Sequence, residues 1–103
     1  MTTMEPAFFE IILSVSDMLA SGFESRDEIG DPLDEALANS GVGEVIGGGS
    51  GLGKAHIDIE ISLAISAEKA VAFLKTALRE INVPRSTIIL RHKPERTEYP
   101  VWE

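Results

Sequence analysis

The segment from Lys54 to Leu63 constrains the fold of this 103-residue chain more than any other segment. Apolar and polar residues alternate strictly through it. The apolar positions are Ile57, Ile59, Ile61 and Leu63, and the polar positions are His56, Asp58, Glu60 and Ser62. Period-two alternation over eight residues predicts a β-strand with one buried face and one open face. The buried face requires a cover, which in a small domain is a layer of helices.

Three further segments have strand character. Residues 7–15 alternate in the same way and predict a central strand, because the second face is partly apolar too. Gly43–Ile46 predicts a short strand, which the glycine-rich connection Gly47–Gly53 joins to the strand that begins at Lys54. Two strands linked in this manner indicate a hairpin. The last strand is expected within Ser86–His92.

Two helices are expected between these strands. The first opens at the capping residue Asp31 and ends before Gly41, or it begins as early as Ser25. The second spans residues 67–82 behind the capping residue Ser66, with apolar residues at three- and four-residue spacing. Both helices therefore present one apolar stripe that can cover the sheet.

The order β-α-β-β-α-β predicts an α+β fold of the ferredoxin-like kind, a four-stranded antiparallel sheet with two helices on one face. Residues 1–92 are expected to form one domain and residues 93–103 a C-terminal tail. Residues 16–30 show no clear pattern, and within them residues 17–20 fit either a helical turn or an extension of the first strand. Trp102 is expected to fold back on the domain or to dock on another subunit. The residues expected in the core are Ile11, Leu13, Leu37, Ile57, Ile59, Ile61, Val71, Leu74 and Leu78.

The charge balance excludes some classes of function. Nine basic and 17 acidic residues give a formal net charge of −8, which argues against binding nucleic acid through its phosphates. The same charge is compatible with solubility or with a basic protein partner. The chain lacks cysteine, and no apolar run approaches the roughly 18 residues of a membrane span. We therefore expect a cytoplasmic protein without membrane contact.

Polar residues on the open face of the predicted sheet form a candidate metal site. His56, Asp58 and Glu60 alternate along one strand, and Glu10 of the first strand could join them. Imidazole and carboxylate ligands suit a divalent ion. The alternative is a solvated face, because successive ligands on a strand stand roughly 7 Å apart. Arg91 is also expected on this face, and His92, of opposite parity, is not.

The glycine-rich connection is nearly a phosphate-binding P-loop. It departs from that motif at Ala55, where the hydroxyl of Ser or Thr should meet magnesium, and Lys54 opens a strand instead of a helix. The alternative is a flexible hairpin tip that lets a ligand or a partner approach the backbone closely. The residues expected to make such contacts are Gly48, Gly49, Ser50, Gly51, Lys54, Glu10, Arg91 and Trp102.

Three segments, Asp34–Leu37, Gly41–Gly53 and Ile57–Glu60, resemble a run found in small uncharacterised bacterial α+β proteins with a glycine-rich hairpin. The resemblance implies a bacterial source and a ferredoxin-like fold, and some such families are suspected immunity proteins. It transfers no functional residue to this chain. Because that fold hosts many unrelated activities, the resemblance does not choose a function.

No catalytic constellation emerges from the serines and the two histidines of the chain. The leading hypothesis is therefore a non-enzymatic binding module without a cofactor, which self-associates as a homodimer. One alternative is an acidic immunity or inhibitor protein against a basic toxin, indicated by the net charge and by the acidic residues between Glu24 and Glu35. The other is a small metal- or anion-dependent enzyme that uses His56, Asp58, Glu60 and the glycine-rich loop.

Overall fold

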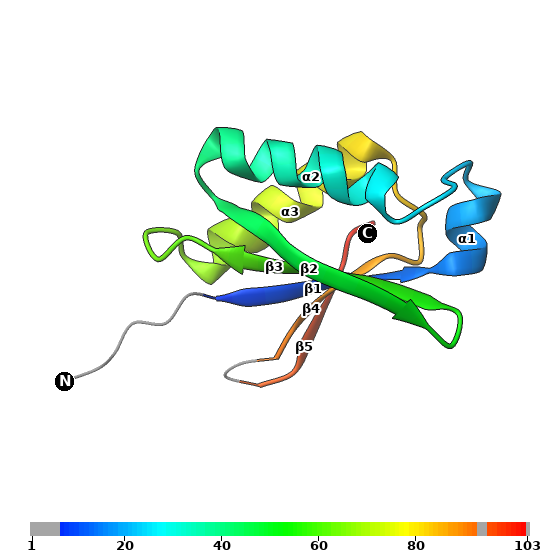
Figure 1. Cartoon of the computed structure of the whole chain (residues 1–103). Helices are drawn as coiled ribbons and strands as arrows, with labels where there is room; N and C mark the ends of the chain where they lie inside the picture. The colour runs from blue at the N-terminus through cyan, green and yellow to red at the C-terminus, as the bar shows by residue number, and fades with distance from the viewer. Residues whose placement is uncertain (1–6, 93–94, 103) are drawn as a thin grey trace.

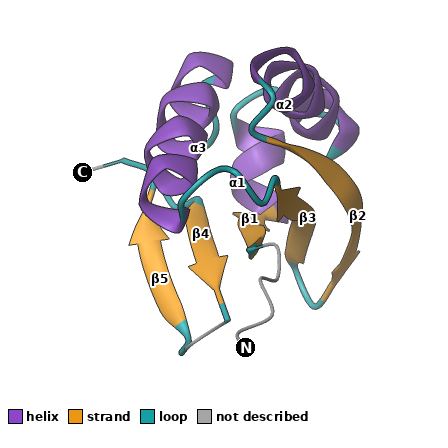
Figure 2. Cartoon of the chain, turned by 90° about the vertical axis from the view of Figure 1, so that its left-hand side faces the viewer, coloured by secondary structure: helices purple, strands orange, loops and turns teal. Residues whose placement is uncertain are grey.

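The computed structural model describes residues 7–92 and 95–102, which form a five-stranded antiparallel sheet and three helices (Figure 1). The strands are β1 (Phe8–Ser14), β2 (Gly43–Gly51), β3 (Lys54–Ile61), β4 (Ile88–Arg91) and β5 (Thr97–Pro100). The helices are α1 (Val15–Ala20), α2 (Asp27–Ser40) and α3 (Ala67–Ile81). The strands stand in the order β2-β3-β1-β4-β5. Helices α2 and α3 cover one face of the sheet, and we call the other face the open face (Figure 2).

The α+β class and the central position of β1 agree with the sequence-based expectation. The expected four strands and two helices were too few, since β5 and α1 add to them. The segment after β1, for which the sequence left two alternatives, forms the short helix α1. The side chain of Ser14 caps this helix by accepting the backbone N–H of Asp17 at 3.3 Å. Among the described residues, no helix is long and apolar enough to cross a membrane.

The core forms where the alternating strands meet the helices. All nine residues expected in the core are buried. Ile11 and Ile57, which stand opposite each other on β1 and β3, are at most 1% exposed. The alternation fails only at its end, because β3 stops at Ile61 and Leu63 is 54% exposed.

The glycine-rich segment is a strand and not a loop, which corrects the expected connection Gly47–Gly53. Strand β2 pairs with β3 as far as Gly51, and only Leu52 and Gly53 form the turn. Both turn residues have positive φ, 53° and 78°, as the tightest hairpin turns require. A bulge between Val45 and Gly47 shifts the register. Few residues favour a loop more than glycine does, but pairing with β3 satisfies the backbone groups of the segment that face β3.

Helix α2 begins at Asp27, so the earlier of the two expected starts is the better one. The Glu28 carboxylate accepts the backbone N–H of Ser25 at 3.3 Å and ties down the chain before the first turn. Ile29 is fully buried, which favours extending the helix to include it. Pro32 consequently lies inside the helix instead of opening it.

The ends of the helices follow the expected capping chemistry. Gly41 closes α2 in the left-handed conformation, with φ of 73°. The Ser66 side chain caps α3 by accepting the backbone N–H of Lys69 at 3.3 Å. Asn82, also left-handed, closes α3. The sequence therefore predicts these ends correctly to within one residue.

The C-terminal segment is part of the sheet. Strand β5 pairs with β4, and Val101 beyond it is fully buried. The indole N–H of Trp102 donates a hydrogen bond to the carbonyl of Val83 at 3.0 Å, and the guanidinium of Arg85 lies 4.0 Å from the ring centroid. Of the two expected arrangements, Trp102 therefore adopts the one in which it folds back on its own domain.

Candidate functional site

The open face carries an excess of acidic residues. Residues directly opposite each other in an antiparallel sheet share a face, so the strand register assigns each side chain to one side. The register assigns several charged and titratable residues to the open face, and the contacts of His92 with Glu10 and of Arg96 with Glu98 add two more. They are Glu10, Glu44, Lys54, His56, Asp58, Glu60, His92, Arg96 and Glu98. Among the described residues of this face, five carboxylates stand against Lys54 and Arg96, and Arg96 pairs with Glu98 at 3.3 Å. The remaining excess of negative charge makes this side of the sheet attractive to cations.

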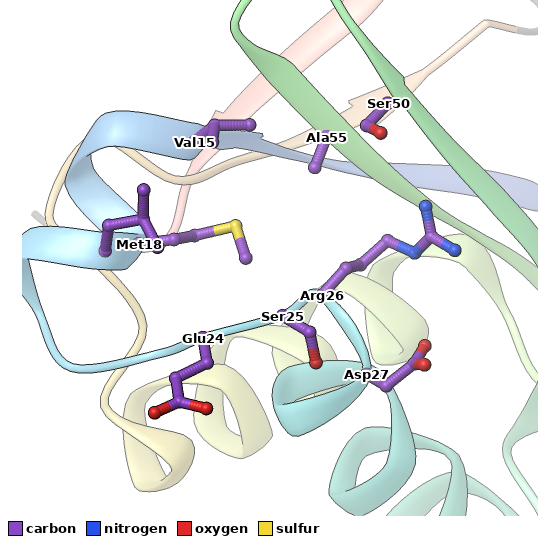
Figure 3. A pocket seen from close by; sticks show the side chains of 9 residues that line it. Val15, Met18, Glu24, Ser25, Arg26, Asp27, Ser50 and Ala55 are labelled. Atoms are coloured by element: carbon purple, nitrogen blue, oxygen red, sulfur yellow. The ribbon is translucent and has the colours of Figure 1, made fainter.

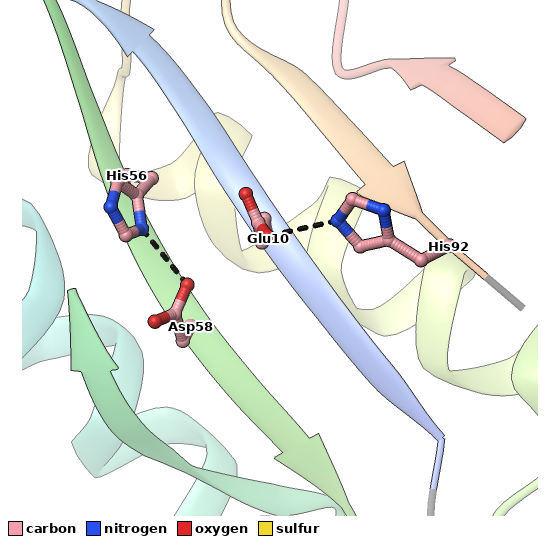
Figure 4. Close-up of polar contacts among 4 residues, drawn as sticks. All are labelled: Glu10, His56, Asp58 and His92. Carbon is pink, nitrogen blue, oxygen red and sulfur yellow. Dashed lines mark hydrogen bonds and ion pairs between the residues drawn. The ribbon is translucent and has the colours of Figure 1, made fainter. Parts of the chain in front are cut away.

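Four of these side chains meet at the centre of the face (Figure 4). On β3, Nδ1 of His56 lies 2.9 Å from Oδ1 of Asp58. Across the sheet, Nε2 of His92 lies 2.8 Å from Oε1 of Glu10 on β1. Glu10, His56 and Asp58 each offer one ligand atom within 4.8 Å of the other two. The face thus holds two imidazole–carboxylate pairs in neighbouring positions.

The structure brings together only some of the residues expected as metal ligands. His56, Asp58 and Glu10 come together, as expected, but Glu60 does not belong to the group. Glu60 lies one step further along β3, opposite Phe8. The spacing of alternate residues on a strand explains this result, since a third ligand reaches the group more easily from the neighbouring strand than from the next position on the same one.

Arg91 and His92 exchange the faces that the sequence indicated. Arg91 stands opposite the buried Phe9 and lies on the helix side, where it lines a cavity of about 360 Å³ with Tyr99 and residues of α3. His92 lies on the open side, against Glu10. The opposite parity of the two residues was predicted correctly, but the face of Arg91 was wrong.

The glycines of β2 give the His56–Asp58 pair its space. Gly49 stands opposite His56, and a Cβ at Gly49 would lie 2.9 Å from Nε2 of the imidazole. Gly47 stands opposite Asp58, and a Cβ there would lie 3.6 Å from Oδ2. The imidazole therefore occupies a position that a side chain at residue 49 would obstruct.

A second candidate site lies where α2 passes over β2 on the helix side of the sheet. A groove of about 390 Å³ opens between the two elements, and we call it the α2–β2 groove. Its lining residues are Arg26, Asp27, Gly30, Asp31, Asp34, Val45, Gly47, Gly48 and Ile57. Asp27 and Asp31 are exposed and stand one helical turn apart on α2.

The groove runs beside the outer edge of β2. Among the described strands this one ends the sheet, so its outward backbone groups have no neighbouring strand there. Near the bulge, one of these outward groups has a partner, because Oδ1 of Asp34 accepts the backbone N–H of Val45 at 2.9 Å. Hydrogen-bonded and non-hydrogen-bonded pairs alternate along an antiparallel ladder, starting from the pair that flanks the turn. Gly48 and Ser50 stand in non-hydrogen-bonded pairs with β3, so their N–H and C=O groups point outward. The free part of the edge is thus the glycine-rich half.

Arg26 closes one end of the groove. Its Nε lies 3.1 Å from the position that a Gly48 Cβ would take, so the guanidinium rests against the strand. Within the described residues, the side chain of Arg26 forms no hydrogen bond or ion pair. On its other side is a cavity of about 310 Å³, which Ser25 and Ser50 also line (Figure 3).

The remaining expected contact residues do not form one site. Lys54 is exposed at the start of β3, opposite Gly51, and lies at the hairpin end of the sheet. Trp102 packs against its own domain. Of the expected contact residues of the hairpin, Gly48, Gly49, Ser50 and Gly51 therefore belong to the edge strand β2, whereas Lys54 belongs to β3. Trp102 lies elsewhere.

No protein-family model matches this chain, and neither a curated protein nor a solved structure matches it significantly. The resemblance to small bacterial proteins is consequently supported by the three segments quoted for it alone.

Proposed function

We propose that this chain is a non-enzymatic interaction module that binds an extended, basic segment of a partner protein along the outer edge of β2. The observation that carries the proposal is the position of the α2–β2 groove, which places carboxylates beside an unpaired strand edge. Main-chain hydrogen bonds to the edge supply affinity in this mode of recognition, and the side chains of the added strand supply specificity.

The edge is accessible to a further strand. The half of β2 from Gly47 to Gly51 bears a single side chain, that of Ser50, so an incoming backbone meets little steric resistance. Proteins commonly protect such an edge with charged side chains, prolines or bulges. Here the bulge and the Asp34 carboxylate protect the first half of β2, and nothing comparable protects the second half within the described residues.

The charge of the groove favours a basic occupant. Asp27, Asp31 and Asp34 line it against the single cation Arg26. Alternate side chains of an added strand would point toward α2, where lysine or arginine would meet Asp27 and Asp31. A second copy of the chain fits this edge less well, because it would bring another acidic α2 against the first.

A short extended peptide that alternates lysine and valine provides a direct test. Titration followed by amide chemical shifts should move the signals of Gly47 to Gly51 and of α2, and the affinity should fall as salt rises. The same peptide N-methylated at alternate residues keeps its charge but loses main-chain donors on one edge. We expect it to bind much more weakly; equal binding of both peptides would show mere charge attraction and would contradict the proposal.

Matched variants separate the groove from the net charge. Asp27→Asn with Asp31→Asn should weaken peptide binding by about five- to tenfold, since exposed pairs each contribute at most about 1 kcal/mol. Glu35→Gln with Glu80→Gln removes the same charge at exposed positions outside the groove and should change binding little. If both double variants weaken binding equally, the groove is not the site.

We also propose that the domain is a ferredoxin-like sandwich to which α1 and β5 are additions. The order β2-β3-β1-β4, with α2 and α3 on one face, supports this classification. Because the fold serves many unrelated activities, the classification does not bear on the choice of partner. An immunity protein that captures a basic toxin is one member of the class of interaction modules proposed here.

A further inference from the structure

We propose that Glu10, His56 and Asp58 form a binding site for a divalent transition-metal ion on the open face, with His92 as a positioning residue. The site is separate from the α2–β2 groove, which lies on the other side of the sheet. The two proposals therefore stand on different residues and fail independently.

The distances are close to those that one ion requires. Ligands about 2.0–2.1 Å from a tetrahedral ion stand about 3.3 Å from one another. Here Nδ1 of His56 and Oδ1 of Asp58 are 2.9 Å apart, and the atoms of all three residues lie within 4.8 Å of one another. Small rotations of these half-buried side chains are enough to place the three atoms around one centre. The positions that protein atoms leave open would be filled by water.

The donor set indicates the class of ion. An imidazole nitrogen with two carboxylate oxygens suits Zn²⁺, Co²⁺, Ni²⁺ or Cu²⁺, whereas Ca²⁺ and Mg²⁺ prefer oxygen ligands alone. The surrounding face adds an attraction for any cation, because Glu44 and Glu60 share it with the two ligand carboxylates, whereas Glu98 is paired with Arg96 at 3.3 Å. Selection among divalent ions would thus depend on the imidazole of His56.

His92 is placed to orient a ligand. Its Nε2 lies 2.8 Å from Oε1 of Glu10, which leaves Oε2 of Glu10 available to the ion. Hydrogen bonds of this kind fix the direction of a ligating carboxylate, and their loss typically weakens metal binding by 10–100-fold. His92 lies outside the group of three whose ligand atoms converge, so we assign it the positioning role.

Calorimetric titration of the full-length chain, freed of any histidine tag, with ZnCl₂ and CoCl₂ tests the proposal. We expect one ion per chain, and for Co²⁺ the visible absorption of a low-coordinate site. His56→Ala should weaken Zn²⁺ binding by more than the roughly 100-fold limit of an outer-shell change. Absence of binding by the wild-type chain would overturn the proposal.

Glu60→Gln is the matched control. It removes a carboxylate from the same strand and the same face, but from outside the group, and should leave Zn²⁺ affinity within about twofold, because a rim charge contributes little. An equal loss in His56→Ala and Glu60→Gln would show diffuse attraction to an acidic surface and would overturn the site.

His92 needs its own readout. His92→Ala should weaken Co²⁺ binding by about 10–100-fold without changing the shape of the visible spectrum, because the ligands remain the same. His92→Gln, which retains a donor that can reach Glu10, should restore part of the affinity. A changed spectrum in His92→Ala would make His92 a ligand and would overturn the positioning role.

Discussion

At residue 49 the absence of a side chain determines where a neighbouring imidazole can lie. Gly49 stands opposite His56 on the edge of the open face, and no positive φ requires glycine there. The space itself is therefore the reason that glycine fits this position. The sequence suggests that this run of glycines is a flexible loop. At residue 49, however, the glycine leaves the space that the imidazole of His56 occupies.

Replacing Gly49 by alanine should consequently disturb His56. The new Cβ would stand 2.9 Å from Nε2, closer than carbon atoms approach a ring, so the imidazole must turn away from Asp58. We expect Zn²⁺ affinity, measured by calorimetry, to fall by about tenfold or more, as when the support of a ligand is lost. Gly51→Ala is the control, because a Cβ at Gly51 meets nothing within 4 Å. Equal affinity in both variants would contradict the steric role of Gly49.

The inverted faces of Arg91 and His92 show the limit of parity arguments at single residues. Alternation determines which residues of a strand share a face. It determines which of the two faces is buried only when the residues of one face are polar. Around β4 the residues Ile88, Ile89 and Leu90 are all apolar, so the sequence offers no contrast from which to choose. The fully buried Ile89 determines the choice, because it places its alternate neighbour Arg91 on the helix side. His92 could therefore have been found only with knowledge of the core.

Among the elements, β2 was the hardest to predict and β3 the easiest. Strand β3 contains its own signal, since its side chains alternate in polarity over its whole length. Strand β2 has almost no side chains in its second half, and glycine disfavours strands when considered alone. Its structure depends on the ladder offered by β3, which is a tertiary interaction that no local pattern reveals. The edge of β2 that carries our functional proposal was thus visible in the sequence only as a run of glycines.

The register of β3 leads to a prediction about stability. Ile59 is fully buried between sheet and helices, so Ile59→Ala should lower the free energy of unfolding by about 2–5 kcal/mol. Leu63 follows the end of the strand and is 54% exposed, so Leu63→Ala should change it by less than about 0.5 kcal/mol. Urea denaturation, followed by the fluorescence of the single tryptophan, measures both. A cost near 0.5 kcal/mol for Ile59→Ala would show that the strand register is wrong.

At the scale of the whole molecule, acidic charge is distributed on both sides of the sheet, next to two different opportunities for binding. On the helix side, aspartates of α2 adjoin an unpaired strand edge. On the open side, carboxylates surround two histidines. Both arrangements attract cations, and both oppose the close approach of a second acidic chain. Trp102 packs within its own domain, so it does not support the expected homodimer.

Self-association therefore remains a prediction, and the dependence of dimer formation on salt concentration can test it. The open face is the surface left for a homodimer, with Phe8, 48% exposed, as its largest apolar side chain. A dimer through this face brings like charges together, so sedimentation should show tighter association as ionic strength rises from about 0.03 M to about 0.5 M. Binding of the basic peptide should respond in the opposite direction. Phe8→Glu should abolish the dimer, whereas Leu19→Glu, an equal change at another exposed apolar residue, should not. A chain that stays monomeric at all these salt concentrations, or a dimer that Phe8→Glu leaves intact, would exclude association through the open face.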